Sequence, residues 1–126
     1  MGNLFLRHGE VQNEKDVFYA NLPGFYLSSK GEKQAKDAAK KIKKLFNIEK
    51  IITSPLLRAR QTASIVNEEL KTDIDVSYNI IEWSGPYEWI GKTIEEIKLT
   101  DSFKNYNNNP LNCLLYTSDA ADDVEC

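Results

Sequence analysis

The stretch "IEKIITSPLLRARQTA", residues 48–63, decides the fold of this chain. Its first half is a run of β-branched residues that is typical of a buried strand. Ser54 then offers a helix N-cap and Pro55 suits the first helical position, so we expect a helix that runs to about Leu70. A strand that passes directly into a helix is the building unit of α/β folds.

The stretch "NLFLRHGEV" near the N-terminus places polar side chains beside this unit. Its apolar start predicts a short buried strand over residues 2–6, and Arg7 and His8 follow at once. The order strand, helix, strand, helix predicts that the first two strands pair in parallel, with their carboxyl ends at one rim of the sheet. Open α/β sheets bind ligands at that rim, where Arg58 in the first turn of the second helix would also lie.

The helix between these two strands is expected to have Ser29 as its N-cap, because Ser29 has capping-box spacing with Glu32. Apolar residues recur at helical intervals and predict one stripe that faces the core: Ala35, Ala38, Ala39, Ile42, Leu45 and Phe46. The lysines of "KKIKKLF" then form its solvated face.

Later segments continue the same rhythm. "DIDVSYNI", residues 73–80, alternates apolar and polar side chains and predicts a half-buried strand. A third helix is expected after Thr93, which has capping spacing with Glu96, and residues 105–110 are expected to form a polar loop. Together these elements predict an α/β three-layer sandwich around a mainly parallel sheet, truncated at its C-terminal end.

The composition narrows the class of protein. The chain has 126 residues, enough for one domain, with 41% hydrophobic and 28% charged residues and a net charge of −3. No concentrated basic face is present, so nucleic-acid binding is not expected, and no apolar run has membrane-spanning length. No secretory signal is visible at the N-terminus, which favours a cytoplasmic location.

The last fourteen residues differ from the rest of the chain. "CLLYTSDAADDVEC", residues 113–126, holds both cysteines and four acidic residues with no basic one. It looks like a translated sequencing adapter, so we interpret it as a non-native tail and residues 1–112 as the N-terminal part of one domain. No disulfide framework follows from these two cysteines. The body of the chain has one histidine and no cysteine, which argues against a metal site.

Two guanidinium groups beside one imidazole suit a phosphate ester. Arginine forks match phosphate oxygens and stay charged, while their charge lowers the pKa of a nearby histidine and keeps its ring neutral. A neutral imidazole beside bound phosphate can act as a nucleophile. Without a further pattern, however, Arg7, His8, Arg58 and Arg60 also fit the description of ordinary surface residues.

Three segments decide between these interpretations. "LRHGEVQN", "LSSKGEKQA" and "TSPLLRARQTA" resemble the histidine phosphatase superfamily, also called the phosphoglycerate mutase-like family, over essentially residues 2–100. The resemblance implies that His8 accepts the phosphoryl group and that Arg7 and Arg58 clamp its oxygens. It also implies that Glu82 protonates the leaving group, although a glutamate between a strand and a turn is ordinarily just solvated.

The chain departs from the family pattern in two places that affect function. The family has a second histidine on a later strand, which this sequence lacks, so we expect the truncated polypeptide to miss part of its site and to be inactive as it stands. The segment after His8 differs from the tryptophan-containing loop of typical mutases, and Asn13 lies one position nearer to His8 than the family asparagine. This favours a phosphatase over a mutase and leaves Asn13 out of the site.

The resemblance therefore implies a phosphoric monoester hydrolase that works through phosphohistidine on a small-molecule phosphate ester. It implies no cofactor, no metal, and no membrane or nucleic-acid partner. Phosphoglycerate mutase and a catalytically silent module that binds phosphorylated ligands remain as alternatives. Three aromatic residues, Trp83, Tyr87 and Trp89, either line a substrate pocket or pack beneath a turn.

Overall fold

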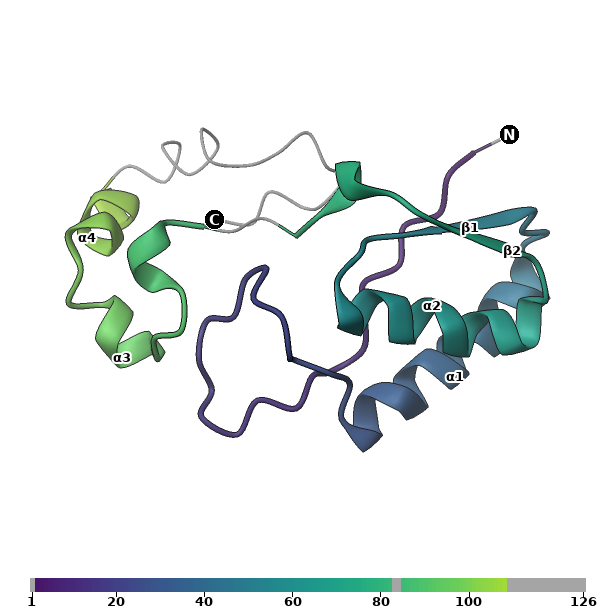
Figure 1. Cartoon of the computed structure of the whole chain (residues 1–126), viewed down its shortest axis with the longest axis horizontal. Helices are drawn as coiled ribbons and strands as arrows, with labels where there is room; N and C mark the ends of the chain where they lie inside the picture. The colour runs from purple at the N-terminus through teal and green to yellow at the C-terminus, as the bar shows by residue number, and fades with distance from the viewer. Residues whose placement is uncertain (1, 83–84, 109–126) are drawn as a thin grey trace. The chain divides into compact units, whose positions relative to one another are not determined.

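A computed structural model describes residues 2–82 and 85–108 of the chain (Figure 1). The predicted tail, residues 113–126, lies outside them. The chain divides into two compact units: the first contains residues 1–12 and 23–80, and the second contains residues 13–22 and everything from residue 81 onward.

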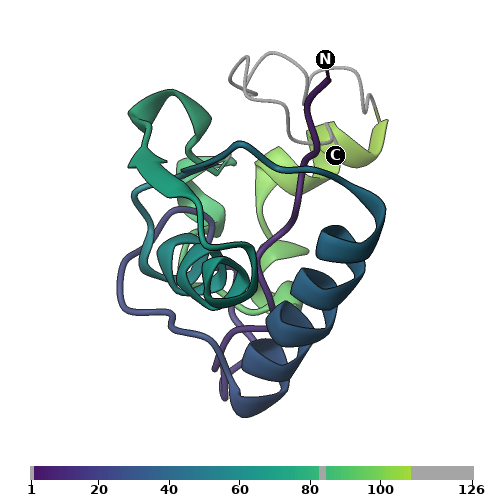
Figure 2. The same ribbon diagram turned by 90° about the vertical axis from the view of Figure 1, so that its right-hand side faces the viewer.

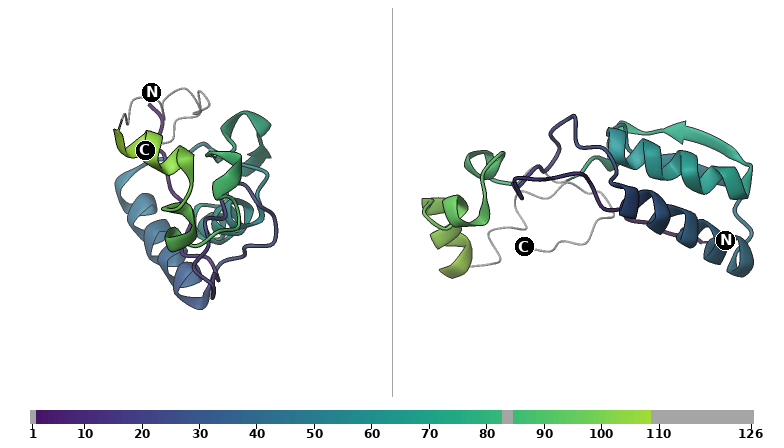
Figure 3. Two further views of the ribbon diagram at one scale, coloured as in Figure 1. Left: turned by 90° about the vertical axis from the view of Figure 1, so that its left-hand side faces the viewer. Right: turned by 90° about the horizontal axis from the view of Figure 1, so that it is seen from below.

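The first unit is a parallel strand pair packed with helices. Strand β1 (Lys50–Thr53) leads through helix α2 (Leu57–Leu70) to strand β2 (Asp73–Val76), and the two strands pair in parallel in the register Lys50↔Asp73 to Thr53↔Val76. Helix α1 (Ser29–Leu45) lies against α2, and α2 lies against β1, as the views in Figures 1, 2 and 3 agree. The predicted α/β class is confirmed by this parallel sheet with its helices.

The core of the first unit lies between the two helices and the loop beneath them. On α1 the buried residues Ala35, Ala39 and Ile42 follow the predicted stripe, and on α2 Ala63 and Val66 face them. The stripe ends earlier than predicted. Leu45 and Phe46 are 71% and 50% exposed. The lysines of the opposite face are exposed, as expected.

The buried strand predicted for residues 2–6 is wrong. This segment runs as irregular coil, drawn in purple in Figure 1, and its apolar side chains Leu4, Phe5 and Leu6 are 46%, 69% and 47% exposed. An apolar run becomes a strand only where a neighbouring strand takes its backbone hydrogen bonds. In the described part of the chain β1 pairs with β2, so the parallel pair is formed by the second and third predicted strands.

The helix starts also differ from the predicted ones. Ser28, not Ser29, caps α1, and its hydroxyl accepts a hydrogen bond from Gly31 N. The backbone N–H of Ser28 also donates to Glu10 O, and this bond favours Ser28 over Ser29 as the cap. Helix α2 begins at Leu57, two residues after the predicted start. The Ser54 hydroxyl closes a turn on the N–H of Leu56 there and delays the helix.

Strand β2 ends sooner than the alternation indicated. After Val76 the chain turns into a short 3₁₀ helix, Tyr78–Ile80, and Tyr78 is 75% exposed. The predicted strand over residues 73–80 is therefore correct only in its first half. Beyond residue 76 no described strand continues beside it, since β1 also ends at its register partner Thr53.

The second unit is built around Trp89. The 3₁₀ helix Tyr87–Trp89 buries this indole against Phe18, with ring centroids 5.8 Å apart in an edge-to-face arrangement, and against Phe103 at 6.1 Å. The backbone of Phe18 exchanges hydrogen bonds of 2.8 Å with Lys92 O and Gly91 N. Residues 13–22 are thereby tied to a segment about seventy residues further along the chain.

Two helices complete the second unit. Helix α3 (Ile94–Ile97) begins with the predicted capping box, in which the Thr93 and Glu96 side chains each bond the other's backbone N–H. The third helix was predicted on "KTIEEIKLTDSF", residues 92–103, but α3 ends at Ile97 and a separate helix α4 (Asp101–Asn108) follows, whose extent corrects the polar loop expected from residue 105. The Thr100 hydroxyl accepts from Phe103 N at 3.2 Å and starts this helix, which then carries the asparagine-rich run; residues 109–110 lie outside the described part.

Candidate functional site

His8 is half-buried at the end of the N-terminal coil, and its ring is held by the next residue. Nδ1 lies 2.7 Å from the carbonyl oxygen of Gly9. Because a carbonyl oxygen only accepts, this hydrogen bond places the proton of the neutral ring on Nδ1. The lone pair of the neutral imidazole is then on Nε2, which is the nitrogen able to attack an electrophile.

The backbone of Gly9 is linked to helix α2 through one hydroxyl. Gly9 N donates to Thr62 Oγ1 at 3.1 Å, and Thr62 Oγ1 donates to the carbonyl oxygen of Arg58 at 2.8 Å. Thr62 therefore contacts both the residue that follows His8 and the backbone of Arg58. The structure brings these two predicted site positions together in the first unit.

Arg58 lies in the first turn of α2 and is only 1% exposed. Burial of a guanidinium group is costly unless it is paired, so the interpretation of Arg58 as ordinary surface charge does not fit. Arg60, two residues on, is exposed and does fit it, and Arg7 is exposed as well. The roles of Arg7 and Arg58 as phosphate clamps stay predictions.

A close contact between two glycines fixes where the loop after His8 runs. A Cβ placed on Gly9 would lie 2.4 Å from Gly31 O, and one placed on Gly31 would lie 2.0 Å from Glu10 O. Only residues without side chains allow this approach between the loop and the first turn of α1. The glycine of "RHG" and that of "SSKGEK" are thus two sides of one contact.

Side chains from α1 and its cap hold Glu10, the next residue along. Glu10 N donates to Gln34 Oε1 at 2.9 Å, and the Ser28 hydroxyl donates to a carboxylate oxygen of Glu10 at 3.2 Å. Lys30 Nζ lies 3.6 Å from the other carboxylate oxygen, on the surface. The loop that carries His8 is consequently held from both helices.

These supporting residues were missed by sequence reasoning. Thr62 and Gly31 stand inside two of the motifs that carried the family resemblance, but they were given no role there. Nothing in the sequence alone says that a threonine on one helix and a glycine on another meet the same loop. Their presence in motifs around a nucleophile was the available signal.

The second unit contains the remaining predicted residues, and each is described within that unit. Glu82 is half-buried, and its role as a proton donor stays a prediction. Trp89 packs beneath a turn and donates from Nε1 to Ser102 Oγ at 2.6 Å, which is the packing alternative of the two given above. Tyr87 is 91% exposed, and Trp83 lies outside the described residues.

Asn13 is engaged within its own loop. Its side-chain amide donates to Val17 O at 2.9 Å and accepts from Val17 N at 3.1 Å. Both of these bonds close residues 13–17 into a turn in the second unit. This arrangement agrees with leaving Asn13 out of the site.

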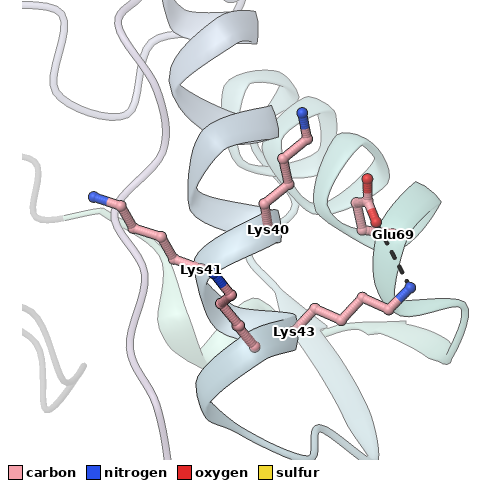
Figure 4. Close-up of a pocket in the computed structure, with 5 residues that line it drawn as sticks. Lys40, Lys41, Lys43 and Glu69 are labelled. Carbon is pink, nitrogen blue, oxygen red and sulfur yellow. Dashed lines mark ion pairs between the residues drawn. The ribbon is translucent and has the colours of Figure 1, made fainter.

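A shallow hollow lies at the other end of α1 from Gly31 and is lined by lysines (Figure 4). Lys43 forms an ion pair of 3.7 Å there with Glu69 of α2, and the neighbouring lysines extend from the exposed face of α1. The nearest of these lysines, Lys40, lies nine residues after Gly31, about two and a half turns along α1, so the hollow is no part of the His8 site. Within residues 2–82 and 85–108, no three histidine, cysteine or acidic side chains gather as metal ligands, and no helix is long and apolar enough to cross a membrane.

Comparisons with known proteins agree with the resemblance. The family model of the histidine phosphatase superfamily (branch 1) matches residues 4–124. The structure of Bacillus stearothermophilus YhfR is 26% identical with a TM-score of 0.70, covering 90% of this chain and 55% of that one. Phosphoserine phosphatase from Entamoeba histolytica, solved in complex with 3-phosphoglyceric acid, is 27% identical with a TM-score of 0.66, covering 79% of this chain and 48% of that one.

A curated relative adds the mutase side of the family. The 2,3-bisphosphoglycerate-dependent phosphoglycerate mutase of Thermoplasma acidophilum is 31% identical over 63% of this chain and 40% of its own length. The chain spans less than half the length of the curated relatives it matches. Relatives with an assigned activity are phosphatases or mutases, and one of the similar structures holds a small phosphorylated ligand.

Proposed function

Because the chain belongs to the histidine phosphatase superfamily, we propose that its protein hydrolyses a phosphate monoester with His8 as the nucleophile. One observation carries the proposal. The hydrogen bond from His8 Nδ1 to Gly9 O puts the proton of the neutral ring on Nδ1 and makes Nε2 the nucleophilic nitrogen, and the same loop is joined through Thr62 to the turn of α2 that holds Arg58.

The reaction proceeds in two steps. His8 Nε2 attacks phosphorus and forms a P–N bond while the P–O bond to the leaving alkoxide breaks. Arg7 and Arg58 neutralise the charge that develops on the phosphoryl oxygens, and Glu82, as a carboxylic acid, gives its proton to the alkoxide. Water then attacks phosphorus and the P–N bond breaks, while the Glu82 carboxylate takes a proton from the water; this releases inorganic phosphate and restores both the neutral imidazole and the Glu82 carboxylic acid.

The buried position of Arg58 supports its part in this scheme. A guanidinium group in a site that excludes water interacts more strongly with phosphate oxygens than one in solvent does. The first turn of α2 adds backbone N–H groups and the positive end of the helix dipole. The substrate is a small phosphate ester, as related proteins bind phosphorylated small molecules, and the scheme needs no metal or cofactor.

The experiment is covalent trapping. The protein is incubated with radiolabelled p-nitrophenyl phosphate and quenched in alkali, where a P–N bond survives, and a matched sample is treated with acid, where it does not. We expect an acid-labile label that mass spectrometry assigns to His8, the one histidine of this sequence. His8→Ala should abolish the label and Arg60→Ala, an exposed neighbour on α2, should keep it. Label that persists in His8→Ala refutes the nucleophile.

Because the match covers only 41% and 40% of the length of two curated relatives, the assay includes both this 126-residue chain and a longer product of the same gene. Label in the longer protein alone agrees with the expectation that the chain is inactive as it stands. Phosphate binding without label or turnover in both would favour the silent module.

The similarity to a phosphoglycerate mutase supports a second candidate activity. In a mutase the phosphohistidine returns its phosphoryl group to an isomeric product and not to water. Two measurements on the same sample separate the activities: release of inorganic phosphate, and interconversion of phosphoglycerates primed by a bisphosphate. Hydrolysis faster than interconversion supports the phosphatase.

A further inference from the structure

Thr62 occupies an unusual position between the two halves of the proposed site. It lies one turn after Arg58 on α2, and its side chain is buried, with 5% exposure. Its hydroxyl joins Gly9 N and Arg58 O, which belong to segments 49 residues apart. Neither the nucleophile scheme nor the phosphate clamp requires Thr62 to touch substrate.

The polarity of this arrangement admits few replacements. An N–H group can only donate and a carbonyl oxygen can only accept, so the single hydroxyl proton of Thr62 goes to Arg58 O and its lone pair accepts from Gly9 N. Serine can make both bonds. Valine has the same shape but can make neither, and it would leave the buried N–H of Gly9 without its acceptor.

Gly9 uses both of its backbone groups in the site. Its carbonyl oxygen accepts from the ring of His8, and its N–H donates to Thr62. Glycine has the widest conformational freedom of any residue, so these bonds and the contact with Gly31 determine where its carbonyl points. The orientation of the His8 ring therefore depends on a group that Thr62 holds.

We propose that Thr62 is the positioning residue of the nucleophile. Through Gly9 it sets the ring orientation and tautomer of His8, and it fixes the position of that ring relative to the turn that carries Arg58. The effect of Thr62 on catalysis rests on the proposed function, whereas its effect on the His8 ring does not. Gln34 and Ser28 bond the neighbouring Glu10 from α1 and its N-cap, so these bonds link the loop to α1 and cannot align it with α2.

The test compares threonine variants by an activity-independent signal. Nitrogen chemical shifts of the imidazole report which ring nitrogen carries the proton, and the chain's single histidine makes the assignment direct. We expect Thr62→Val to shift His8 from the Nδ1–H form towards the Nε2–H form, and Thr62→Ser to retain Nδ1–H. Thr53→Val is the matched control, because Thr53 is equally buried but its hydroxyl bonds only the adjacent Ser54 O.

Kinetics supply the second readout. In the phosphatase assay on the longer gene product, Thr62→Val should lower kcat about tenfold to a hundredfold, the range expected for a displaced reacting group, with KM within about threefold of the parent value. Thr62→Ser should restore kcat, and Thr53→Val should leave it unchanged.

Each outcome decides the inference. Unchanged His8 shifts in Thr62→Val overturn it, whether or not the protein is an enzyme, and so does a loss of kcat that Thr53→Val shares. If Thr62→Val does not fold, Thr62→Ala removes the same hydroxyl with less strain in a helix and is judged by the same shifts. Expected shift changes in this chain, together with a longer gene product that has no phosphatase activity, refute the proposed function and keep the positioning role.

Discussion

Gly31→Ala should destabilise the first unit, although the same change in an ordinary helix stabilises it. Gly31 lies in the first turn of α1, where replacing glycine by alanine in open surroundings gains about 1 kcal/mol. Here the new Cβ would lie 2.0 Å from Glu10 O and 2.8 Å from Glu10 N. These are backbone atoms, so the loop itself has to move.

Overpacking of this kind typically costs about 1–3 kcal/mol, so after the gain of about 1 kcal/mol the net loss in the free energy of unfolding is about 0–2 kcal/mol. In a unit of this size that corresponds to a fall in Tm of about 4–8 °C per kcal/mol. Far-ultraviolet circular dichroism during urea or thermal unfolding measures it through α1 and α2. Gly2→Ala is the control, because a Cβ there meets nothing within 4 Å. A variant Gly31→Ala that is more stable than the parent would refute the close contact between loop and helix.

Three further predictions concern single side chains. Arg58→Lys keeps the charge but loses the planar fork, so we expect the Kd for inorganic phosphate, measured by calorimetry, to rise about tenfold; an unchanged Kd would argue against the clamp. The bonds from Thr93 lower the pKa of Glu96 below its ordinary value of 4.5, so its cap stabilises α3 above that pH and is lost as the pH falls through the lowered pKa. Amide exchange of Ile97 should therefore accelerate on acidification in the parent and much less in Glu96→Gln, whose amide still caps; equal pH dependence in both would contradict this origin. Trp89→Phe removes the N–H bonded to Ser102 and should cost about 1–2 kcal/mol of unfolding free energy, while a change within 0.5 kcal/mol or so would show that this bond adds little.

Local signals in the sequence were reliable where a single segment decides the structure. The capping box at Thr93 and the buried alanine stripe of α1 follow from spacing alone, and the strand before α2 follows from its β-branched run. The N-cap of α1 could not be assigned from the sequence, because Ser28 and Ser29 can both cap a helix. The hydrogen bond from Ser28 N to Glu10 O favours Ser28.

Pairing between distant segments could not be predicted in the same way. The coil at residues 2–6 has the composition of a strand, yet its backbone finds no ladder in the described part of the chain. For the candidate site, the motifs predicted His8 and Arg58. The hydrogen bonds that link the two segments run through Gly9 and Thr62, which lie more than fifty residues apart in the sequence. Such contacts depend on the packing of α2 against the loop and leave no periodic trace in the sequence.

The division of the chain into two units has a consequence for protein engineering. Residues 13–22 leave the first unit and return to it, so the backbone passes between the units at three points, after residues 12, 22 and 80. A chain that ends after residue 80 would keep residues 13–22 but lose Trp89, against which Phe18 packs. Obtaining the first unit by itself therefore requires replacing residues 13–22 with a short flexible linker, since removing the chain from residue 81 onward leaves residues 13–22 of the second unit behind.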